Sequence, residues 1–423
     1  MSLPRNLMYD NAISASFAKN FVTVLNCNNT NNHSTGSTAI ISVPCMNNQV
    51  LSWNDSVLKM KLKLTAVGAA SCHLDRSGIA GCIQRIRIFA AGSTLIYDLD
   101  NYGNLVTQLT SFQESHDTLQ GKLAVLQGTE SDLRGKTIDV GAGASVDVNF
   151  AFPLMTCLGM SDRYFPCYAL AGSGPLRIEI QFVSSALKFL NSDQADVTAQ
   201  FNEVQLCANY VELSDSGMNL VKEASGPRTD FVCQAYTNYV FNAKINAAGS
   251  QLSMPIPAKF SSLKALYVTQ RAQADAAGAA EHFPYDSTNF SLSQYTASIG
   301  SKVIPADPAS TSSVPSQLAE LERALGSVTN SMSQSSYRIA QIQQAGRQAG
   351  QDARSNCFMV GIETESYSSA PMGSTYSGLN TTQDDIYFRP VYPAQDEVDI
   401  RLDAYAAYDQ LVSIENGVVS VNF

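Results

Sequence analysis

A two-residue hydrophobic period runs through most of this chain. Residues 176–182 read LRIEIQF, so Arg177, Glu179 and Gln181 alternate with four apolar residues. Successive side chains of a β-strand point to opposite faces, and this alternation therefore predicts a strand with one buried and one solvated face. Further predicted strands lie at residues 58–64, 83–89, 146–152, 204–210, 231–240, 251–256 and 263–268.

Glycine-containing turns separate the predicted strands. They lie at residues 91–93, 141–143 and 172–175. Many short strands joined by such turns favour an antiparallel sandwich or barrel over a parallel α/β sheet. Near the end of the chain, Asn416-Gly417 stands between two strand-forming segments. This dipeptide predicts a type I′ hairpin, because both of its residues accept a positive φ.

The length of the chain predicts two domains. A single hydrophobic core stops growing at about 250–300 residues, and this chain has 423. Residues 214–229 are mostly polar and contain two glycines and a proline, so we place a boundary there, between domains at residues 1–219 and 220–423. Strands of similar texture occur near the start of each half, at residues 83–89 and 263–269, which suggests a duplicated architecture.

The second half also contains a segment with helical spacing. Pro315 stands near the first helical position, and apolar residues recur at three- and four-residue intervals up to Leu325. Residues 333–353 are rich in Gln and Ala and fit either a second, solvated helix or a long loop. Residues 306–313 are expected to be a surface connector. We therefore place helical insertions in the second domain, near residues 315–353.

Composition and charge exclude several classes of protein. The chain is 45% hydrophobic and only 15% charged, as expected for a folded protein with a large neutral surface that suits contacts between copies. Its net charge is −10, and its first 35 residues contain only Arg5 and Lys19 as cations. Direct nucleic-acid binding through a basic arm is therefore not expected. We expect neither a signal peptide nor a membrane span, since no suitable apolar run occurs.

No motif predicts a catalytic, cofactor-binding or metal-binding residue, and the chain is not expected to be an enzyme. Cys72, His73 and Asp75 form the nearest approach to a ligand cluster, but a structural zinc site needs four ligands and no second pair is visible. The nine cysteines are expected to be reduced, apolar core residues. Pairing of Cys157 with Cys167 stays open.

Three other features have ordinary structural interpretations. Gly135-Lys136-Thr137 ends like a phosphate-binding loop, but Glu130 replaces the first glycine, so a polar turn is expected. The acidic pairs at residues 384–385 and 396–397 are expected to be solvated loop charges, with calcium binding between subunits as the minor alternative. Trp53, the one tryptophan of the chain, is expected to pack in the core.

Several segments carry a resemblance to a known family. Residues 83–105 combine a strand, a glycine-containing turn and the element Asn101-Tyr102. Residues 149–170 contain a PL…G…YxP pattern, which consists of Pro153, Leu154, Gly159, Tyr164 and Pro166. The strands LRIEIQF and NEVQLCANYVEL follow.

The second half continues the same pattern. Its matching segments lie at residues 291–308, 358–369, 377–382 and 401–423. The last of these contains the aromatic-Asp step Tyr408-Asp409. In this order, the segments resemble the major capsid proteins of the double jelly-roll lineage, which includes tailless icosahedral phages, adenoviruses, virophages and Polinton-like viruses.

This resemblance implies both a fold and a role. The fold is all-β, with two tandem antiparallel eight-stranded jelly-roll barrels and short helical insertions in the second. The role is that of a major capsid protein, which forms pseudo-hexameric homotrimeric capsomers of an icosahedral shell. The expected location is the virion, after assembly in the host cytoplasm or nucleus. The chain is compact, so tower-like loop decorations are not expected.

The partners follow from the same resemblance. They are other copies of the chain, neighbouring capsomers, and penton and minor capsid proteins. Contacts are expected from the barrel sides, from residues 315–325 and from the terminal segments. Residues 1–21, with Phe17 and Phe21 as apolar anchors, are expected to reach neighbours or an internal membrane.

Two alternatives stay open. One is another viral structural role, as a minor or penton capsid protein or as a single-shell capsid subunit of an RNA virus, although the missing basic arm counts against the last. The other is a carbohydrate-binding β-sandwich or a sandwich glycosidase, which would need a groove lined with tryptophans and a carboxylate pair. A chain whose one tryptophan is Trp53 fits this requirement poorly.

Overall fold

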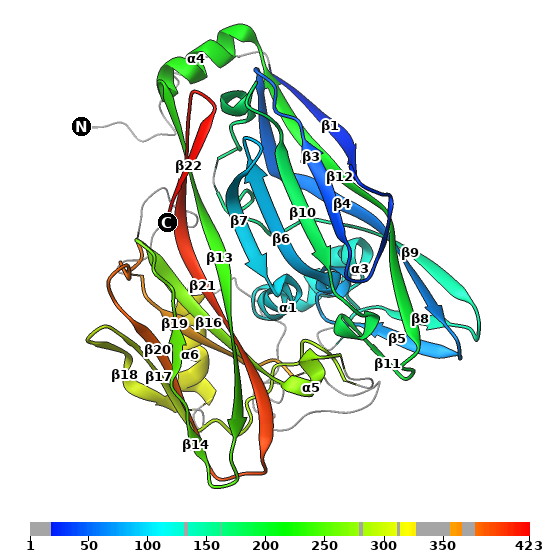
Figure 1. Ribbon diagram of the computed structural model, residues 1–423, viewed down its shortest axis with the longest axis vertical. Coiled ribbons are helices and arrows are strands. Elements are labelled where there is room, and N and C mark those ends of the chain that lie inside the picture. The colour runs from blue at the N-terminus through cyan, green and yellow to red at the C-terminus, as the bar shows by residue number, and fades with distance from the viewer. Residues whose placement is uncertain are drawn as a thin grey trace, which may run out of the picture.

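The two halves of the chain fold as two β-sandwiches. Figure 1 shows the first in blue to green and the second in green to red. The computed structural model describes residues 18–130, 134–161, 163–278, 282–310, 314–326, 356–365 and 377–423.

The first half contains two facing sheets. One has the order β1-β12-β4-β9 and the other β3-β10-β6-β7, with β2 paired to β12 and a further sheet β11-β5-β8. The strands are β1 Ala18–Asn26, β2 Asn32–Ser34, β3 Thr38–Val43, β4 Gln49–Ala66, β5 Ala70–Leu74, β6 Ile83–Ala90, β7 Thr94–Asp100, β8 Thr137–Val140, β9 Ser145–Phe152, β10 Leu176–Phe182, β11 Leu190–Ser192 and β12 Val197–Leu213. Every pairing in these sheets is antiparallel.

The second half repeats this plan. Its sheets have the orders β13-β21-β16-β19 and β14-β20-β17-β18, with β22 paired to β21 and β15 to β20. The strands are β13 Arg228–Ile245, β14 Ser250–Gln251, β15 Met254–Ile256, β16 Leu263–Ala272, β17 Gln294–Ile299, β18 Lys302–Ser310, β19 Met359–Glu363, β20 Ile386–Tyr392, β21 Val398–Glu415 and β22 Val418–Asn422. These strands also pair in antiparallel fashion.

Both halves have the same topology. When the eight principal strands of each half are numbered in chain order, one sheet has the order first-eighth-third-sixth and the other second-seventh-fourth-fifth. The eight strands are β1, β3, β4, β6, β7, β9, β10 and β12 in the first half, and β13, β14, β16, β17, β18, β19, β20 and β21 in the second. This is the jelly-roll arrangement. The prediction of two tandem antiparallel eight-stranded jelly rolls is therefore confirmed.

Each barrel encloses its own core. In β10 the burial follows the sequence alternation, with Ile178 and Ile180 fully buried. Phe182 of β10 and Phe201 of β12 stack across the first sandwich, with ring centroids 4.2 Å apart. In the second sandwich, the Tyr392 hydroxyl of β20 donates a hydrogen bond to Gln270 Oε1 of β16 at 2.7 Å. Inward-facing residues of two sheets thus form each core.

The predicted helix of the second half is present as α6, Val314–Ala324. It packs on β19, where a Cβ at Gly361 would lie 2.9 Å from the Leu321 Cα, so only glycine permits this approach. The Tyr267 hydroxyl of β16 donates to the Ala324 carbonyl at 2.7 Å. The apolar side of α6 is therefore used within its own barrel. The predicted helix or loop at 333–353 lies outside the described residues.

The first barrel also carries helical insertions, which the sequence prediction placed only in the second. They are α1 Tyr102–Gln113, α2 His116–Gln120 and α3 Lys122–Gln127, between the fifth and sixth strands, which is also where α6 lies in the second barrel. The remaining helices are α4 Asp215–Ser225, α5 Gln273–Ala276 and the 3₁₀ turns η2 Gly78–Cys82, η3 Cys167–Leu170 and η4 Ala186–Lys188. Ten of the twelve residues of α1 are buried, so it lacks the one-sided apolar stripe that marks a surface helix.

Two linking segments differ from expectation. The polar stretch at 214–229 is mostly α4, and the Ser214 hydroxyl caps it by accepting a hydrogen bond from the Gly217 N–H. Residues 306–310, expected to be a surface connector, belong to β18 instead, so that prediction is wrong for them. The strands of the first barrel end at Leu213 and those of the second begin at Arg228. The boundary between residues 219 and 220 itself stays a prediction.

Local predictions from single residues hold well. Asn416 and Gly417 have φ angles of 51° and 78° between β21 and β22, which confirms the type I′ hairpin. Trp53 is 4% exposed, and its indole Nε1–H donates to the Leu154 carbonyl at 2.9 Å, so it is a core residue. Phe21 lies on β1 and stacks on Tyr210 of its own barrel. It is therefore not a free anchor, and Phe17 lies outside the described residues.

Candidate functional site

The nearest sequence approach to a metal site is not assembled. The Cys72 thiol contacts the Ser192 hydroxyl at 3.7 Å, and His73 Nδ1 lies 3.0 Å from the Thr137 hydroxyl. Asp75 instead points toward the second barrel, where its carboxylate accepts a hydrogen bond from the Tyr285 N–H at 3.1 Å. In the described part of the chain, no three His, Cys, Asp or Glu side chains gather as metal ligands would.

The other polar motifs also have structural roles. Lys259 Nζ donates to the Asp384 carbonyl and to Asp385 Oδ1, at 2.6 and 2.9 Å. Lys244 pairs with Glu397 at 2.5 Å on the surface. The acidic pairs are thus solvated loop charges that already have lysine partners. Thr137 begins β8 and donates to Glu130 at 3.2 Å, so the phosphate-loop-like segment leads into a strand.

The structure places the cysteines beside other partners than the Cys157–Cys167 pairing that the sequence left open. All nine are free thiols. The Cys157 thiol contacts Cys233 of β13, and the Cys167 thiol contacts Cys45. Cys157 and Cys167 are therefore not partners of each other. Burial raises the pKa of the Cys157 thiol well above its usual value, which keeps the thiol protonated and unreactive.

The main concentration of buried polar chemistry lies between the two barrels. Its centre is Asp403 of β21, which is fully buried. Its carboxylate accepts hydrogen bonds from Arg271 at 2.7 Å, from Arg401 at 3.0 and 3.1 Å, and from the Asn101 amide of the first barrel at 3.3 Å. Burial alone would raise the pKa of Asp403, but Arg271 and Arg401 outweigh it and hold the pKa below its usual value.

Helix α1 docks on this centre through its first turn. The Asn104 amide donates to the Thr269 hydroxyl of β16 and to the Tyr405 hydroxyl of β21, both at 2.9 Å. The Tyr405 hydroxyl in turn donates to the Asn101 carbonyl at 3.1 Å. Asn101 adopts a left-handed conformation with φ of 50°, which asparagine tolerates well, and this bend turns the chain from β7 into α1. Residues some 300 positions apart are thereby joined.

A second group of contacts surrounds Tyr285. Its hydroxyl donates to the Gly81 carbonyl of η2 at 2.6 Å, and its own carbonyl accepts from the Gln108 amide of α1 at 2.8 Å. A Cβ at Gly103 would lie 2.5 Å from the Tyr285 hydroxyl oxygen, so glycine is required where the two barrels approach. The buried Arg76 guanidinium donates to the Asn356 carbonyl at 2.8 Å.

Two buried aspartates of this group behave differently from Asp403. Burial raises the pKa of Asp75, although Arg76 opposes the effect. Burial also raises the pKa of Asp286 well above its usual value, and the neighbouring Asp75 adds to the shift. Asp286 still accepts a hydrogen bond from the Asn356 N–H at 2.9 Å. The interface therefore contains both a strongly ionised carboxylate and carboxylates that resist ionisation.

Apolar and backbone contacts complete the interface. Phe165 and Phe231 meet edge to face, with ring centroids 5.3 Å apart. The Ser161 hydroxyl donates to the Val232 carbonyl at 2.8 Å, and the Gln410 amide donates to the Ile96 carbonyl at 2.5 Å. A buried interface that is satisfied by directional bonds from both sides fixes the relative orientation of the two barrels.

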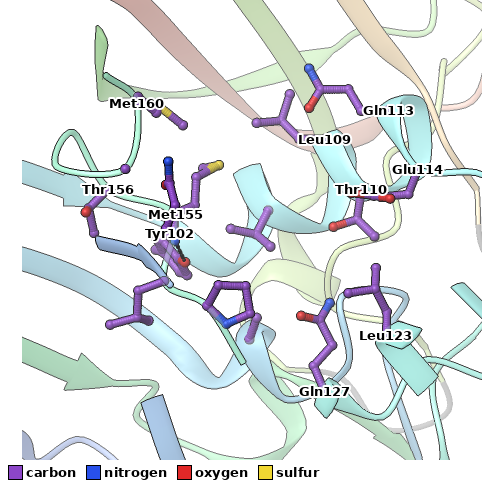
Figure 2. Close-up of a pocket in the computed structure, with 16 residues that line it drawn as sticks. Tyr102, Leu109, Thr110, Gln113, Glu114, Leu123, Gln127, Met155, Thr156 and Met160 are labelled. Carbon is purple, nitrogen blue, oxygen red and sulfur yellow. Dashed lines mark hydrogen bonds between the residues drawn. The ribbon is translucent and has the colours of Figure 1, made fainter. Parts of the chain in front are cut away.

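A pocket of about 330 Å³ opens beside α1 and α3 (Figure 2). Leu109 and Leu123 line it from the two helices, while Met155 and Met160 approach from the loop after β9. Glu114 is the one charged residue among its described lining residues, so the pocket holds no convergent acid–base pair. Its chemistry suits an apolar side chain better than a reacting substrate.

Sequence reasoning missed the interface because most of its members carry no local signal. Asn101-Tyr102 and Tyr408-Asp409 were noticed, but only through the family resemblance. Asp403, a charged residue inside the buried strand β21, is the available sign, whereas Asp409 bonds to Ser262 within the second barrel. No helix in the described part of the chain is long and apolar enough to cross a membrane.

The comparisons with known proteins agree on the fold. No family model and no curated protein matches the chain. The quasi-atomic model of the PBCV-1 virus capsid is similar over 96% of this chain and 97% of its own, with a TM-score of 0.63 and 10% identity. The Faustovirus major capsid protein is similar over 95% of this chain and 92% of its own, with a TM-score of 0.62 and 9% identity. The mavirus major capsid protein is similar over 100% of this chain and 95% of its own, with a TM-score of 0.56 and 8% identity. The chain therefore has the double jelly-roll fold that these viral capsid proteins share.

Proposed function

We propose that this chain is a major capsid protein, three copies of which form a pseudo-hexameric capsomer of an icosahedral shell. The observation that carries the proposal is the identical topology of the two barrels. Two similar barrels in each of three copies supply six similar corners. The full-length likeness to viral major capsid proteins of the same two-barrel fold supports this role.

The interface between the barrels supports the same role. A capsomer with six corners needs a constant angle between the two barrels of each copy. The buried network around Asp403 and Tyr285 supplies that constancy. The proposed role is structural and not enzymatic, in a virion, with neighbouring capsomers and with penton and minor capsid proteins as partners. The proposed domains are residues 1–219 and 220–423.

The first strand of each barrel offers a surface for contacts between copies. In the described residues, β1 pairs only with β12, and β13 only with β21. The first part of the other edge of β13 contacts the first barrel, where the Gln234 N–H donates to the Met160 carbonyl at 2.9 Å, so its unpaired edge lies farther along the strand, toward Val240. Val22 and Val24 of β1 are 61% and 51% exposed, and Val240 of β13 is 44% exposed. Closed threefold symmetry needs a head-to-tail contact between two different surfaces. The equivalent but non-identical edges of β1 and β13 meet this need.

The proposal is tested by the mass of the native protein in solution, measured by light scattering coupled to size exclusion. We expect three times the 45.5 kDa chain mass, stable on dilution, because obligate interfaces bury roughly 2,000–5,000 Å². Electron microscopy of the same fraction should show particles of hexagonal outline. A monomer at all concentrations would refute the capsomer.

A matched pair of variants locates the contact. The double variant Val22→Asp/Val24→Asp should yield a folded monomer, because it places two charges on the β1 edge. The control Val67→Asp, at a residue 76% exposed in the loop after β4, should stay trimeric. Circular dichroism confirms that both remain folded. A trimeric double variant would exclude the β1 edge as the contact.

The carbohydrate-binding alternative lacks support. It requires an exposed tryptophan platform, whereas Trp53 is buried and bonded to Leu154.

A further inference from the structure

A second cavity, of about 310 Å³, lies between the two barrels. The first barrel contributes Gln181 of β10, Ser184 of the segment after β10, and Lys188 of η4. Arg271 of β16 and Arg401 of β21 line it from the second. Its volume falls in the range of small-molecule sites, at the lower end. The cavity is distinct from the pocket beside α1.

Every charged residue that lines this cavity, in the part of the chain that the structure describes, is a cation. These are Lys188, Arg271 and Arg401. Two carboxylates lie behind the lining: Asp403 is shared between the two arginines, and Asp100 accepts a hydrogen bond from the lining amide of Gln84 at 2.9 Å. Three positive charges therefore face the cavity, and Asp403 behind it holds the two arginines in place. Gln181 and Ser184 add neutral hydrogen-bonding groups.

Two of these cations have unused hydrogen-bonding capacity. Arg271 is 3% exposed and donates from Nη1 to the Pro284 carbonyl and from Nη2 to Asp403, but its buried Nε–H has no partner. A buried donor without an acceptor destabilises the folded protein. Lys188 forms no ion pair with any residue that the structure describes. A bound anion would satisfy both groups.

We propose that this cavity binds a small oxyanion of the phosphate class, which links the two barrels. Guanidinium groups match tetrahedral oxyanions with parallel N–H bonds, and an ammonium adds a point charge. A negatively charged oxyanion offsets the three cations that face the cavity. It would connect η4 of the first barrel to β16 and β21 of the second, so its binding would stabilise their docking.

The test is binding of orthophosphate to the full-length protein, measured by isothermal titration calorimetry in a chloride buffer, with ADP as a second probe. We expect saturable binding of one phosphate group per chain. Lys188→Gln should weaken the affinity at least about tenfold, because a charge-assisted hydrogen bond is lost. Ser184→Asp, at the exposed rim of the cavity, should weaken it as well by repulsion.

Lys122→Gln is the control, since it removes one exposed positive charge on α3, away from the cavity. It should bind phosphate as the wild type does. Tight binding of orthophosphate alone identifies a free ion, whereas tighter binding of ADP identifies a nucleotide, and both support the site. Absence of saturable binding by either probe refutes it. Equal affinity of Lys188→Gln and the wild type refutes it too, and thermal unfolding checks that each variant is folded.

Discussion

Replacing Asp403 with alanine tests whether the buried ionic network holds the barrels together. The substitution removes the acceptor of five hydrogen bonds, which come from Arg271, from two nitrogens of Arg401, and from the amides of Asn101 and Asn104. Arg271 is 4% exposed at its side chain and stays buried without its partner, whereas Arg401, at 22%, can turn toward solvent. The main cost is therefore the uncompensated charge of Arg271.

The magnitude follows from this asymmetry. Removing one partner of a buried ion pair costs about 3–5 kcal/mol, which is a large share of the roughly 5–15 kcal/mol that stabilises a typical domain. Asp403→Asn keeps one carbonyl acceptor but loses the charge and the second acceptor oxygen, because an NH2 donor replaces that oxygen. A hydrogen bond to a charged group contributes about 1.5–3 kcal/mol, so the amide variant should lie between the wild type and alanine.

The assay is urea unfolding followed by both Trp53 fluorescence, which reports the first barrel, and far-ultraviolet circular dichroism, which reports both. The control is Asp385→Ala, which breaks an ion pair whose carboxylate is 74% exposed and should cost no more than about 1 kcal/mol. If Asp403→Ala lowers the free energy of unfolding by less than 1 kcal/mol, the network does not hold the barrels. Asp403→Asn keeps the test decisive should the alanine variant fail to fold.

Three further predictions concern the same interface. Asp286→Asn should stabilise the protein at pH 7, because the folded pKa of Asp286 is raised and the stability of the wild type therefore falls as the pH rises from about 4. Urea titrations should show a smaller difference in unfolding free energy between pH 5 and pH 7 for the variant than for the wild type. An equal difference would contradict this. The pH dependence of Asp403 has the opposite sign, because its folded pKa is lowered: its contribution to the unfolding free energy is complete above about pH 4 and is lost below it. In acid titrations, the unfolding free energy of Asp403→Asn should therefore vary less with pH than that of the wild type. Gly103→Ala should cost about 1–3 kcal/mol, because its Cβ would overlap both the Tyr285 hydroxyl and the Gly81 carbonyl oxygen. A melting temperature equal to that of the wild type would show that both groups can move aside.

The strands could be predicted from the sequence because each strand carries its own signal. In β10 and β4 the apolar residues face one core and the polar residues face away, so a two-residue period reports the fold directly. The Asn416-Gly417 hairpin has the same local character. Helix α1 was missed for the opposite reason. It is buried on nearly all sides, and its own buried residues include the polar Thr107 and Gln108, so no one-sided apolar pattern remains.

The interface between the barrels could not be predicted for a different reason. Its bonds join residues such as Asn101 and Asp403, whose separation of 302 positions leaves no pattern in either neighbourhood. The cysteines show the same limit. Cys157 and Cys167 are close in sequence, yet the thiol that contacts Cys157 belongs to Cys233 of the other barrel. Which polar residues meet depends on how two finished barrels dock, and that information appears only in three dimensions.

The polar character of this interface has a consequence for assembly. An apolar interface can slide or rotate by a few degrees with little loss, because dispersion and hydrophobic burial are not directional. The bonds around Asp403 and Tyr285 need donors and acceptors within about 3 Å on both sides, so a rotated arrangement leaves buried groups unsatisfied. In the proposed capsomer, an error in the angle between the barrels is repeated in all three copies and prevents the ring from closing. A network that contributes little net stability would still be retained there, since it excludes every docking angle but one.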